Sequence, residues 1–238
     1  MKYLIIPDVH DKVNLVDRIL DQEGSWDQLV FLGDFFDDFS TGAKEARQTA
    51  ERVKKWLDEA VCLLGNHDVP YGWMRPEYLC SGNTYEKAKV INEILKTEDW
   101  DKFRLHCWVE DLTGETWLLT HAGLHSAHVS PSSDLLKVQV DTLLQNTLHD
   151  LKGGRRTKLL GAGWDRGGSQ EYGGVTWCDF RQLVPVPGLN QICGHTPYTE
   201  VRIKTINESH QIVCLDTHLR HYAVIEDSSL SIRETPIA

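Results

Sequence analysis

The chain has 238 residues, and its 25 lysines and arginines against 35 aspartates and glutamates give a formal net charge of −10 at pH 7. This length suits one large globular domain, and the content of 41% hydrophobic and 25% charged residues argues against a disordered protein. The acidic balance also argues against broad electrostatic capture of nucleic acid or of an anionic membrane surface.

The first half of the chain alternates predicted strands with predicted helices. Apolar runs with the length and composition of buried strands occur at residues 3–6, 29–32 and 61–64. Between them, apolar residues repeat with helical spacing over 13–20 and 46–60, and a third helix is predicted at 85–95. This βαβαβ order predicts a parallel sheet with right-handed crossovers.

The second half has a different character. Residues 105–109 and 116–120 flank a Thr-Gly-Glu turn and predict a hairpin. Ser130 as N-cap and Pro131 at the first helical position predict a helix that continues to Leu151. A glycine-rich segment at 153–174 follows, and we treat it as a candidate lid because it contains Trp164 and Arg166.

Short strands are predicted in the last part of the chain, at residues 190–193, 201–206, 211–215, 222–225 and 230–232. Together with the first half, they indicate an α/β protein built as a two-sheet β-sandwich flanked by helices in four αββα layers. We expect a single domain over residues 1–238.

Two observations bear on the cellular location. The first apolar run stops at Pro7 and is too short for a signal peptide or a membrane-spanning helix. The six cysteines contain no C-x-x-C pair, so we expect reduced thiols rather than a disulfide framework. Both observations favour a cytoplasmic protein that does not bind a membrane.

Six predicted strands are followed at once by acidic, amide or imidazole side chains. These are Asp8 and His10, Asp34 and Asp37, Asn66 and His67, and then His121, His195 and Asp216. Loops just beyond the carboxyl ends of strands are where α/β sheets build their ligand sites, so we expect these side chains to converge.

The types of side chain indicate the class of metal. Carboxylates, imidazoles and an amide oxygen without thiolates suit divalent Mn, Fe, Ni, Co or Zn, and we take Mn²⁺ as the first choice. A carboxylate shared by two such ions is the arrangement that activates water for in-line attack on phosphorus. Two divalent ions at this edge of the sheets would provide that arrangement.

The order of these motifs resembles a known family. The motifs are Asp8-x-His10, Gly33-Asp34-x-x-Asp37, Gly65-Asn66-His67-Asp68, His121, and Gly194-His195-Thr196-Pro197 followed by Asp216-Thr217. They resemble the calcineurin-like metallophosphoesterases over about residues 3–232, and within them the small bacterial and phage members of the phosphoprotein phosphatase lineage.

The resemblance implies a role for each matching residue. It places Asp8, His10 and Asp34 on one metal ion, and lets Asp34 bridge to a second ion held by Asn66, His121 and His195. A metal-bound hydroxide would then attack phosphorus, and Asn66 would also contact the substrate phosphate. His67 would protonate the leaving oxygen, held by Asp37 rather than by Asp68.

The chain departs from the family pattern at the phosphate contacts. Asp38 stands where the family usually has an arginine that grips phosphate, whereas Arg166 in Trp164-Asp165-Arg166 matches a second phosphate-binding arginine. Candidates that would compensate for the lost arginine are Arg75, Arg155 and Arg156. His218 follows Asp216-Thr217 where relatives usually have glycine, so we expect Asp216 to support the ligands rather than bind the metal.

These observations predict an enzyme, a metal-dependent phosphatase that hydrolyses phosphate monoesters of proteins or of small molecules. Three alternatives stay open: a nucleotide or diadenosine-polyphosphate hydrolase, a phosphodiesterase, and a non-catalytic scaffold of the same fold. The expected partner is a phosphate-ester substrate, no general nucleic-acid binding is expected, and the sequence does not predict an oligomeric state.

Overall fold

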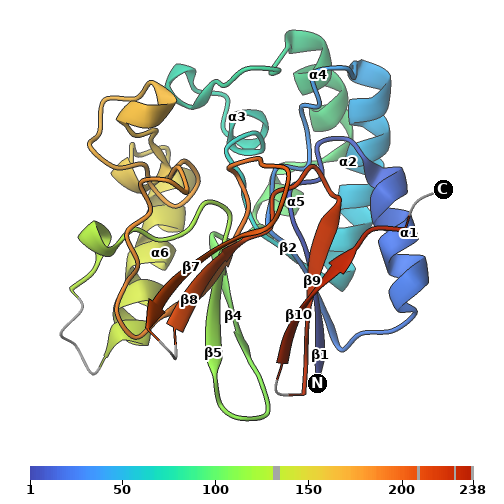
Figure 1. The fold of residues 1–238 in the computed structure, drawn as a ribbon. Helices are drawn as coiled ribbons and strands as arrows, with labels where there is room; N and C mark the ends of the chain where they lie inside the picture. The colour runs from blue at the N-terminus through green and yellow to red at the C-terminus, as the bar shows by residue number, and fades with distance from the viewer. Residues whose placement is uncertain (131–134, 208–209, 228, 237–238) are drawn as a thin grey trace.

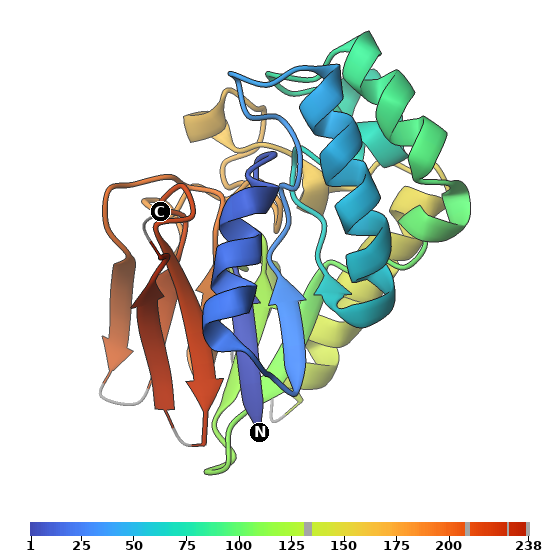
Figure 2. The same ribbon diagram turned by 90° about the vertical axis from the view of Figure 1, so that its right-hand side faces the viewer.

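The computed structural model describes residues 1–130, 135–207, 210–227 and 229–236, which form two five-stranded sheets with helices on their outer faces (Figures 1 and 2). The first sheet has the order β10-β9-β1-β2-β3. Its strands are β1 (Lys2–Ile6), β2 (Gln28–Phe31), β3 (Val61–Cys62), β9 (His221–Glu226) and β10 (Ser229–Glu234). The first three are parallel, as predicted, and α1 (Val13–Glu23) and α2 (Ala43–Glu59) connect them.

The second sheet has the order β4-β5-β6-β8-β7. Its strands are β4 (His106–Glu110), β5 (Thr116–Thr120), β6 (Asn190–Cys193), β7 (Arg202–Asn207) and β8 (His210–Cys214). The central strands β5, β6 and β8 are parallel to one another, while β4 and β7 pair antiparallel at the two edges. The predicted 105–120 hairpin is therefore the β4–β5 pair.

The remaining helices lie around the sheets. They are α3 (Val69–Gly72), α4 (Tyr85–Ile94), α5 (Thr97–Trp100), α6 (Leu136–Lys152) and short 3₁₀ helices at Pro76–Tyr78, Ser126–His128, Lys158–Leu160 and Trp164–Arg166. The predicted start of α6 at Pro131 lies outside the described residues. Within the described part of the chain, every helix is too short or too polar to cross a lipid bilayer.

Side chains alternate along each strand, so each sheet contributes one face to the core between the two sheets and the other face to the core beneath the helices. In β1, Tyr3 and Ile5 pack between the two sheets, whereas Leu4 and Ile6 pack against the helices. Helices α1 and α2 cover the first sheet and α6 lies beside the second (Figure 1). This arrangement confirms the predicted αββα sandwich. All six cysteines are free thiols, and only Cys80 among them is not fully buried.

Candidate metal centre

The candidate site lies where the carboxyl ends of parallel strands from both sheets meet, at the end of the sandwich opposite the N-terminus (Figure 1). Strands β1, β2 and β3 lead to Asp8, Asp34 and Asn66, while β5 and β6 lead to His121 and His195. The two sheets touch here, because the His195 amide donates a 2.9 Å hydrogen bond to Asp8 Oδ1. The six predicted ligands therefore converge from five separate segments of the chain, since Asp8 and His10 both follow β1.

Three clusters of side chains in the described residues have the geometry to hold a metal ion. In each, one ligand atom per residue lies within 4.8 Å of the others; the clusters are Asp8–His10–Asp34, Asp34–His121–His195 and Asp37–His67–Cys80. Asp34 belongs to the first two. A carboxylate that borders two clusters is placed where two neighbouring ions would share it.

Close backbone approaches explain the glycines that precede the ligands. A Cβ atom on Gly65 would lie 2.1 Å from Asp34 Oδ1, and one on Gly194 would lie 2.0 Å from Asp8 Oδ2. Asp34 and His195 themselves have left-handed φ angles of +52° and +69°. Such angles are uncommon for residues other than glycine, so the loops hold these side chains in a strained conformation that aims them at the site.

Hydrogen bonds to backbone carbonyls orient two of the imidazoles. His121 Nδ1 lies 2.9 Å from the carbonyl oxygen of Leu32, and His10 Nδ1 lies 2.8 Å from that of Phe36. A carbonyl only accepts hydrogen bonds, so Nδ1 carries the proton in the neutral form of each ring. In that form both Nε2 atoms present a lone pair, which is the state of a metal ligand.

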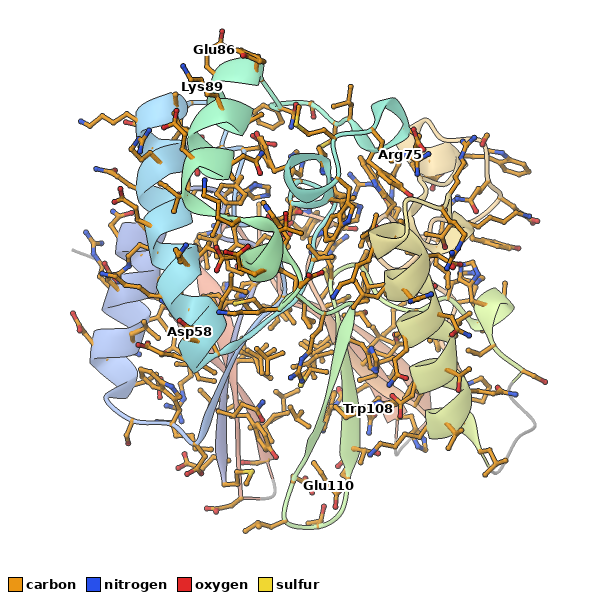
Figure 3. All side chains as sticks on the ribbon, turned by 180° about the vertical axis from the view of Figure 1, so that it is seen from behind. Asp58, Arg75, Glu86, Lys89, Trp108 and Glu110 are labelled. Atoms are coloured by element: carbon orange, nitrogen blue, oxygen red, sulfur yellow. The ribbon has the colours of Figure 1, made fainter. Side chains whose placement is uncertain are left out.

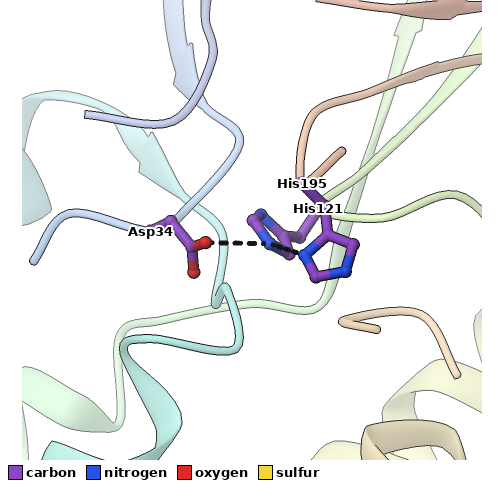
Figure 4. Close-up of side chains that lie close together, drawn as sticks. All are labelled: Asp34, His121 and His195. Carbon is purple, nitrogen blue, oxygen red and sulfur yellow. Dashed lines mark hydrogen bonds and ion pairs between the residues drawn. The ribbon is translucent and has the colours of Figure 1, made fainter. Parts of the chain in front are cut away.

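The Nε2 atom of His121 faces several other acceptors. It lies 3.2 Å from His195 Nδ1 and 3.3 Å from Asp34 Oδ2 (Figure 4). It also lies 3.1 Å from Asn66 Oδ1. Asp8 Oδ2 and His195 Nε2 are buried and have no hydrogen-bond partner among the described residues. Acceptor atoms that converge in a buried place, with two of them unpartnered, need positive charge between them, so this donor set fits divalent metal ions.

The electrostatics of the site point the same way. Burial by itself lowers the pKa of His121, but the carboxylates of Asp34 and Asp8 outweigh burial and raise it to about 9. The pKa of Asp8 is also raised, because burial and the negative charge of Asp216 both disfavour its charged carboxylate. The centre thus has an excess of negative charge that draws in positive charge.

His67 and Asp37 form the pair that the sequence predicts. His67 Nδ1 lies 3.1 Å from Asp37 Oδ2, and Asp37 also receives hydrogen bonds from Tyr71 (2.5 Å) and Lys87 (3.3 Å). Burial lowers the pKa of His67, but the charge of Asp34 and the bond to Asp37 raise it to about 11. Cys80, which the sequence analysis did not include in the site, places Sγ 3.4 Å from the same nitrogen.

Asp68 has a different task from its neighbour in the sequence. Its carboxylate accepts hydrogen bonds from the backbone amides of Asp34 (2.7 Å), Phe35 (2.9 Å) and Gly65 (2.8 Å). It therefore fixes the loop that carries the shared carboxylate and does not contact His67 through a hydrogen bond. This agrees with the expectation that Asp37 is the partner of His67.

A pocket of about 430 Å³ opens over the site. Predicted residues that line it are His10, Asp34, Asp37, Asn66, His67, Arg166, His195 and Asp216, and those that the sequence analysis missed are Lys12, Phe39, Ser40, Ser81 and Trp177. Lys12, Phe39 and Ser40 had one usable signal, since each lies two or three positions after a predicted site residue. Ser81 and Trp177 approach only through the folding of their loops.

The phosphate-binding candidates are placed unequally. Arg166 lines the pocket, with Nε 3.0 Å from Asp179 Oδ2 and Nη2 donating to Thr196 Oγ1 at 3.2 Å. Arg75, labelled in Figure 3, instead contacts the carbonyl of Gly154 and the carboxylate of Glu77.

The other two candidates for the lost arginine do not reach the pocket. Arg155 pairs with Asp150, and neither it nor Arg75 or Arg156 is among the described residues that line the pocket. None of these three arginines is therefore placed beside Asp38, and the side chains of Arg75 and Arg155 are bound elsewhere on the surface. The cation beside Asp38 is instead Lys12, whose Nζ atom lies 3.3 Å from Asp38 Oδ2.

The departures near Asp216 have a local explanation. His218 has a φ of +58°, in the left-handed region that glycine favours, which accounts for the glycine usual in the resembled family. The His218 amide donates to Asp216 Oδ1 at 3.2 Å. Asp216 lines the pocket but belongs to none of the three ligand clusters, in line with a supporting role.

Comparisons with known proteins agree with this geometry. No curated protein sequence matches the chain significantly. The structure is similar to the cold-active protein-tyrosine phosphatase of a psychrophilic Shewanella species (16% identity, TM-score 0.58, 99% of this chain and 80% of that one). It is also similar to a metallophosphoesterase from Sphaerobacter thermophilus (14% identity, TM-score 0.50, 100% of this chain and 89% of that one). A third similar structure is a protein serine/threonine phosphatase from Saccharomyces cerevisiae (14% identity, TM-score 0.50, 100% of this chain and 80% of that one).

These identities are low, so the solved structures show a shared fold and do not assign a substrate. The family model for calcineurin-like phosphoesterases, however, matches residues 1–198, which include every predicted metal ligand. The chain belongs to the calcineurin-like phosphoesterase family, and it is a metal-dependent hydrolase of phosphoric esters.

Proposed function

We propose that this protein is a phosphomonoesterase that works with two divalent metal ions, Mn²⁺ being the first choice. The observation that carries the proposal is the position of Asp34, which belongs to two ligand clusters and lies between them. Its Oδ2 atom is 3.8 Å from His10 Nε2 on one side and 3.3 Å from His121 Nε2 on the other. Free cysteines suit a reducing compartment, so we place the enzyme in the cytoplasm.

The chain offers ligands for both ions. Asp8 and His10 would hold one ion, Asn66, His121 and His195 would hold the other, and Asp34 would bind both. Ions bound there would supply positive charge for the phosphate and lower the pKa of water, which is the chemistry of two-metal phosphoesterases. The carbonyl contacts of His10 and His121 keep both imidazoles in the tautomer that this requires.

His67 is the proposed general acid. Asp37 holds its Nδ1 atom, so the Nε2–H is free to donate a proton to the leaving oxygen of the substrate. Tyr71 and Lys87 in turn hold Asp37, which fixes the ring in a single orientation. The high pKa of His67 keeps that proton in place at neutral pH, and cations bound beside Asp34 would bring the pKa down toward the working range.

The phosphate contacts favour a monoester. Arg166 reaches the pocket from the 153–174 segment, which is thus in a position to cover the substrate. Lys12 offsets the negative charge of Asp38, whose carboxylate also accepts hydrogen bonds from the Ser40 amide (2.8 Å) and hydroxyl (2.6 Å). A dianionic monoester therefore meets less repulsion from Asp38 than the sequence alone implies.

Replacing Lys12 with methionine is expected to raise KM for p-nitrophenyl phosphate about 5- to 10-fold, with kcat little changed. This change in KM corresponds to roughly 1 kcal/mol of substrate binding free energy, lost because the negative charge of the half-buried Asp38 no longer has a cation beside it. Steady-state kinetics of Lys12→Met, and of Lys12→Met combined with Asp38→Asn, test the reasoning. If the double variant keeps the high KM, the charge of Asp38 is not the cause.

The proposed function is tested by turnover of metal-stripped protein that has been reconstituted with Mn²⁺, on p-nitrophenyl phosphate and on bis(p-nitrophenyl) phosphate. We expect a higher kcat/KM for the monoester. A preference for the diester would contradict the proposal and favour the phosphodiesterase alternative. No turnover of either ester by protein that binds Mn²⁺ would contradict the proposal and favour a scaffold.

A further inference from the structure

A second cavity lies beside the metal pocket. Its volume is about 360 Å³, and it shares two lining residues, Arg166 and Pro197, with the metal pocket. Two further arginines, Arg181 and Arg202, and the half-exposed ring of Tyr198 also line it. Arg166, Thr196 and Pro197 belong to the family motifs described above, but those motifs include neither Arg181 nor Arg202.

One buried carboxylate holds two of the three guanidinium groups. Asp179 Oδ2 lies 3.0 Å from Arg166 Nε, and Arg181 binds the same carboxylate through Nε at 2.9 Å and Nη2 at 3.1 Å. Burial raises the pKa of Asp179, but its bonds to Arg181 outweigh burial and lower it to about 2. The single carboxylate of Asp179 thus positions two guanidinium groups and can neutralise only one of them. The Arg181 side chain remains 70% exposed.

Arg202 is held without a carboxylate. Its guanidinium lies over the rings of Phe180 (4.8 Å) and Tyr198 (5.2 Å) and donates to the carbonyl of Thr196. Its Nη2 atom also lies 3.5 Å from Cys214 Sγ, and among the described residues its buried Nε atom has no hydrogen-bond partner and no carboxylate pairs with it. Its positive charge is therefore available to a ligand.

The lining carries more positive than negative charge, since three arginines face only Asp165 and Asp179. The chain as a whole has a net charge of −10, so a positive cavity next to the catalytic pocket is a local exception. The planar fork of arginine matches the oxygens of phosphate, and an excess of such forks in a cavity attracts an anion.

We propose that this cavity is a second anion-binding subsite, which takes a phosphate group of the substrate other than the one that is hydrolysed. The proposal rests on the proposed function, because Arg166 would contact the cleaved phosphate on one side and border the second phosphate on the other. Arg181 and Arg202 hold the second phosphate. The preferred substrates are then compounds with two phosphate groups rather than simple monoesters.

The test uses competitive inhibition of p-nitrophenyl phosphate hydrolysis by the Mn²⁺-loaded protein. The probes are bisphosphates of linear diols from three to six carbons, each compared with the monophosphate of the same diol. We expect at least one bisphosphate to have a Ki about 10-fold lower than its monophosphate. In Arg181→Gln this advantage should largely disappear, while the Ki of the monophosphates stays the same.

Arg155→Gln is the matched control, because Arg155 is also an exposed arginine paired with an aspartate but lies outside both cavities. It should keep the bisphosphate advantage. The proposal is overturned if no bisphosphate binds more tightly than its monophosphate, or if the advantage survives in Arg181→Gln combined with Arg202→Gln. Equal inhibition by ω-carboxyalkyl phosphates would overturn the assignment to phosphate and point to an acidic peptide.

Calorimetric titration of the same bisphosphates into the Mn²⁺-loaded protein separates the two hypotheses. If wild-type protein does not turn over p-nitrophenyl phosphate, the proposed function fails. The subsite is still supported when a bisphosphate binds about 10-fold more tightly than its monophosphate and Arg181→Gln removes the difference. It is rejected when the two affinities are equal.

Discussion

Asp34→Asn should lose bound metal and phosphoesterase turnover together. Asp34 Oδ1 accepts the His67 amide at 2.8 Å, and Oδ2 faces the imidazoles of His10 and His121. An asparagine keeps the shape and tolerates the left-handed φ of +52°, so the loop is expected to fold as before. Its NH₂ group would, however, point donors at the imidazole lone pairs and remove the charge that two cations share.

The loss should be large. Replacing residues that only support a metal ligand already costs about 10- to 100-fold in affinity or activity, so a shared ligand should cost more than about 100-fold. Metal content after dialysis, measured by mass spectrometry, and turnover of p-nitrophenyl phosphate provide the two readouts. Asp227→Asn is the matched control, because Asp227 also has a left-handed φ (+57°) but is exposed and outside the pocket. A fully metallated and active Asp34→Asn protein would reject the shared-ligand assignment.

His67→Asn should separate catalysis from metal binding. His67 lines the pocket through its side chain, and it belongs to neither of the two clusters that share Asp34. Loss of a general acid typically lowers turnover by about 10²- to 10⁴-fold. We therefore expect kcat for p-nitrophenyl phosphate to fall in that range, while the content of Mn²⁺ stays at the wild-type level.

The leaving group provides a sharper readout for His67. Activated esters such as p-nitrophenyl phosphate need less protonation of the leaving oxygen than alkyl phosphates do, so the variant should lose more activity on an alkyl phosphate. His149→Asn, at an exposed position of α6, is the matched control and should behave as wild type. Equal losses on both classes of ester would argue that His67 positions the substrate instead of donating a proton. Loss of Mn²⁺ would instead favour the Asp37–His67–Cys80 cluster as a metal site.

The fold and the convergence of polar side chains at one sheet edge could be predicted from the sequence because both follow from local rules, whereas the assignment of individual ligands came from the resemblance to the calcineurin-like family. Apolar runs of strand length and helical spacing between them predicted β1 to β3 with α1 and α2, and the parallel order followed from their alternation. Polar residues directly after those strands share one sheet edge by necessity, so the convergence of Asp8, Asp34 and Asn66 followed as well.

The tertiary structure decided which charged side chains reach the pocket. Arg75 and Arg155 were reasonable candidates in the sequence, but their loops carry them to Gly154 and Asp150. Lys12 takes the position beside Asp38 because the loop after β1 crosses the one after β2, a contact between segments that no local pattern encodes.

The same holds for the second cavity. Arg166 ends a 3₁₀ helix, Arg181 lies in a loop and Arg202 begins β7 of the second sheet, and a single carboxylate, Asp179, brings the first two together. Spacing along the chain determines which residues follow a strand, so the sequence by itself determined which candidate ligands lie at the shared edge of the sheets. Contacts between distant loops depend on how the whole chain packs, so only the tertiary structure decided which cationic side chains line the two cavities.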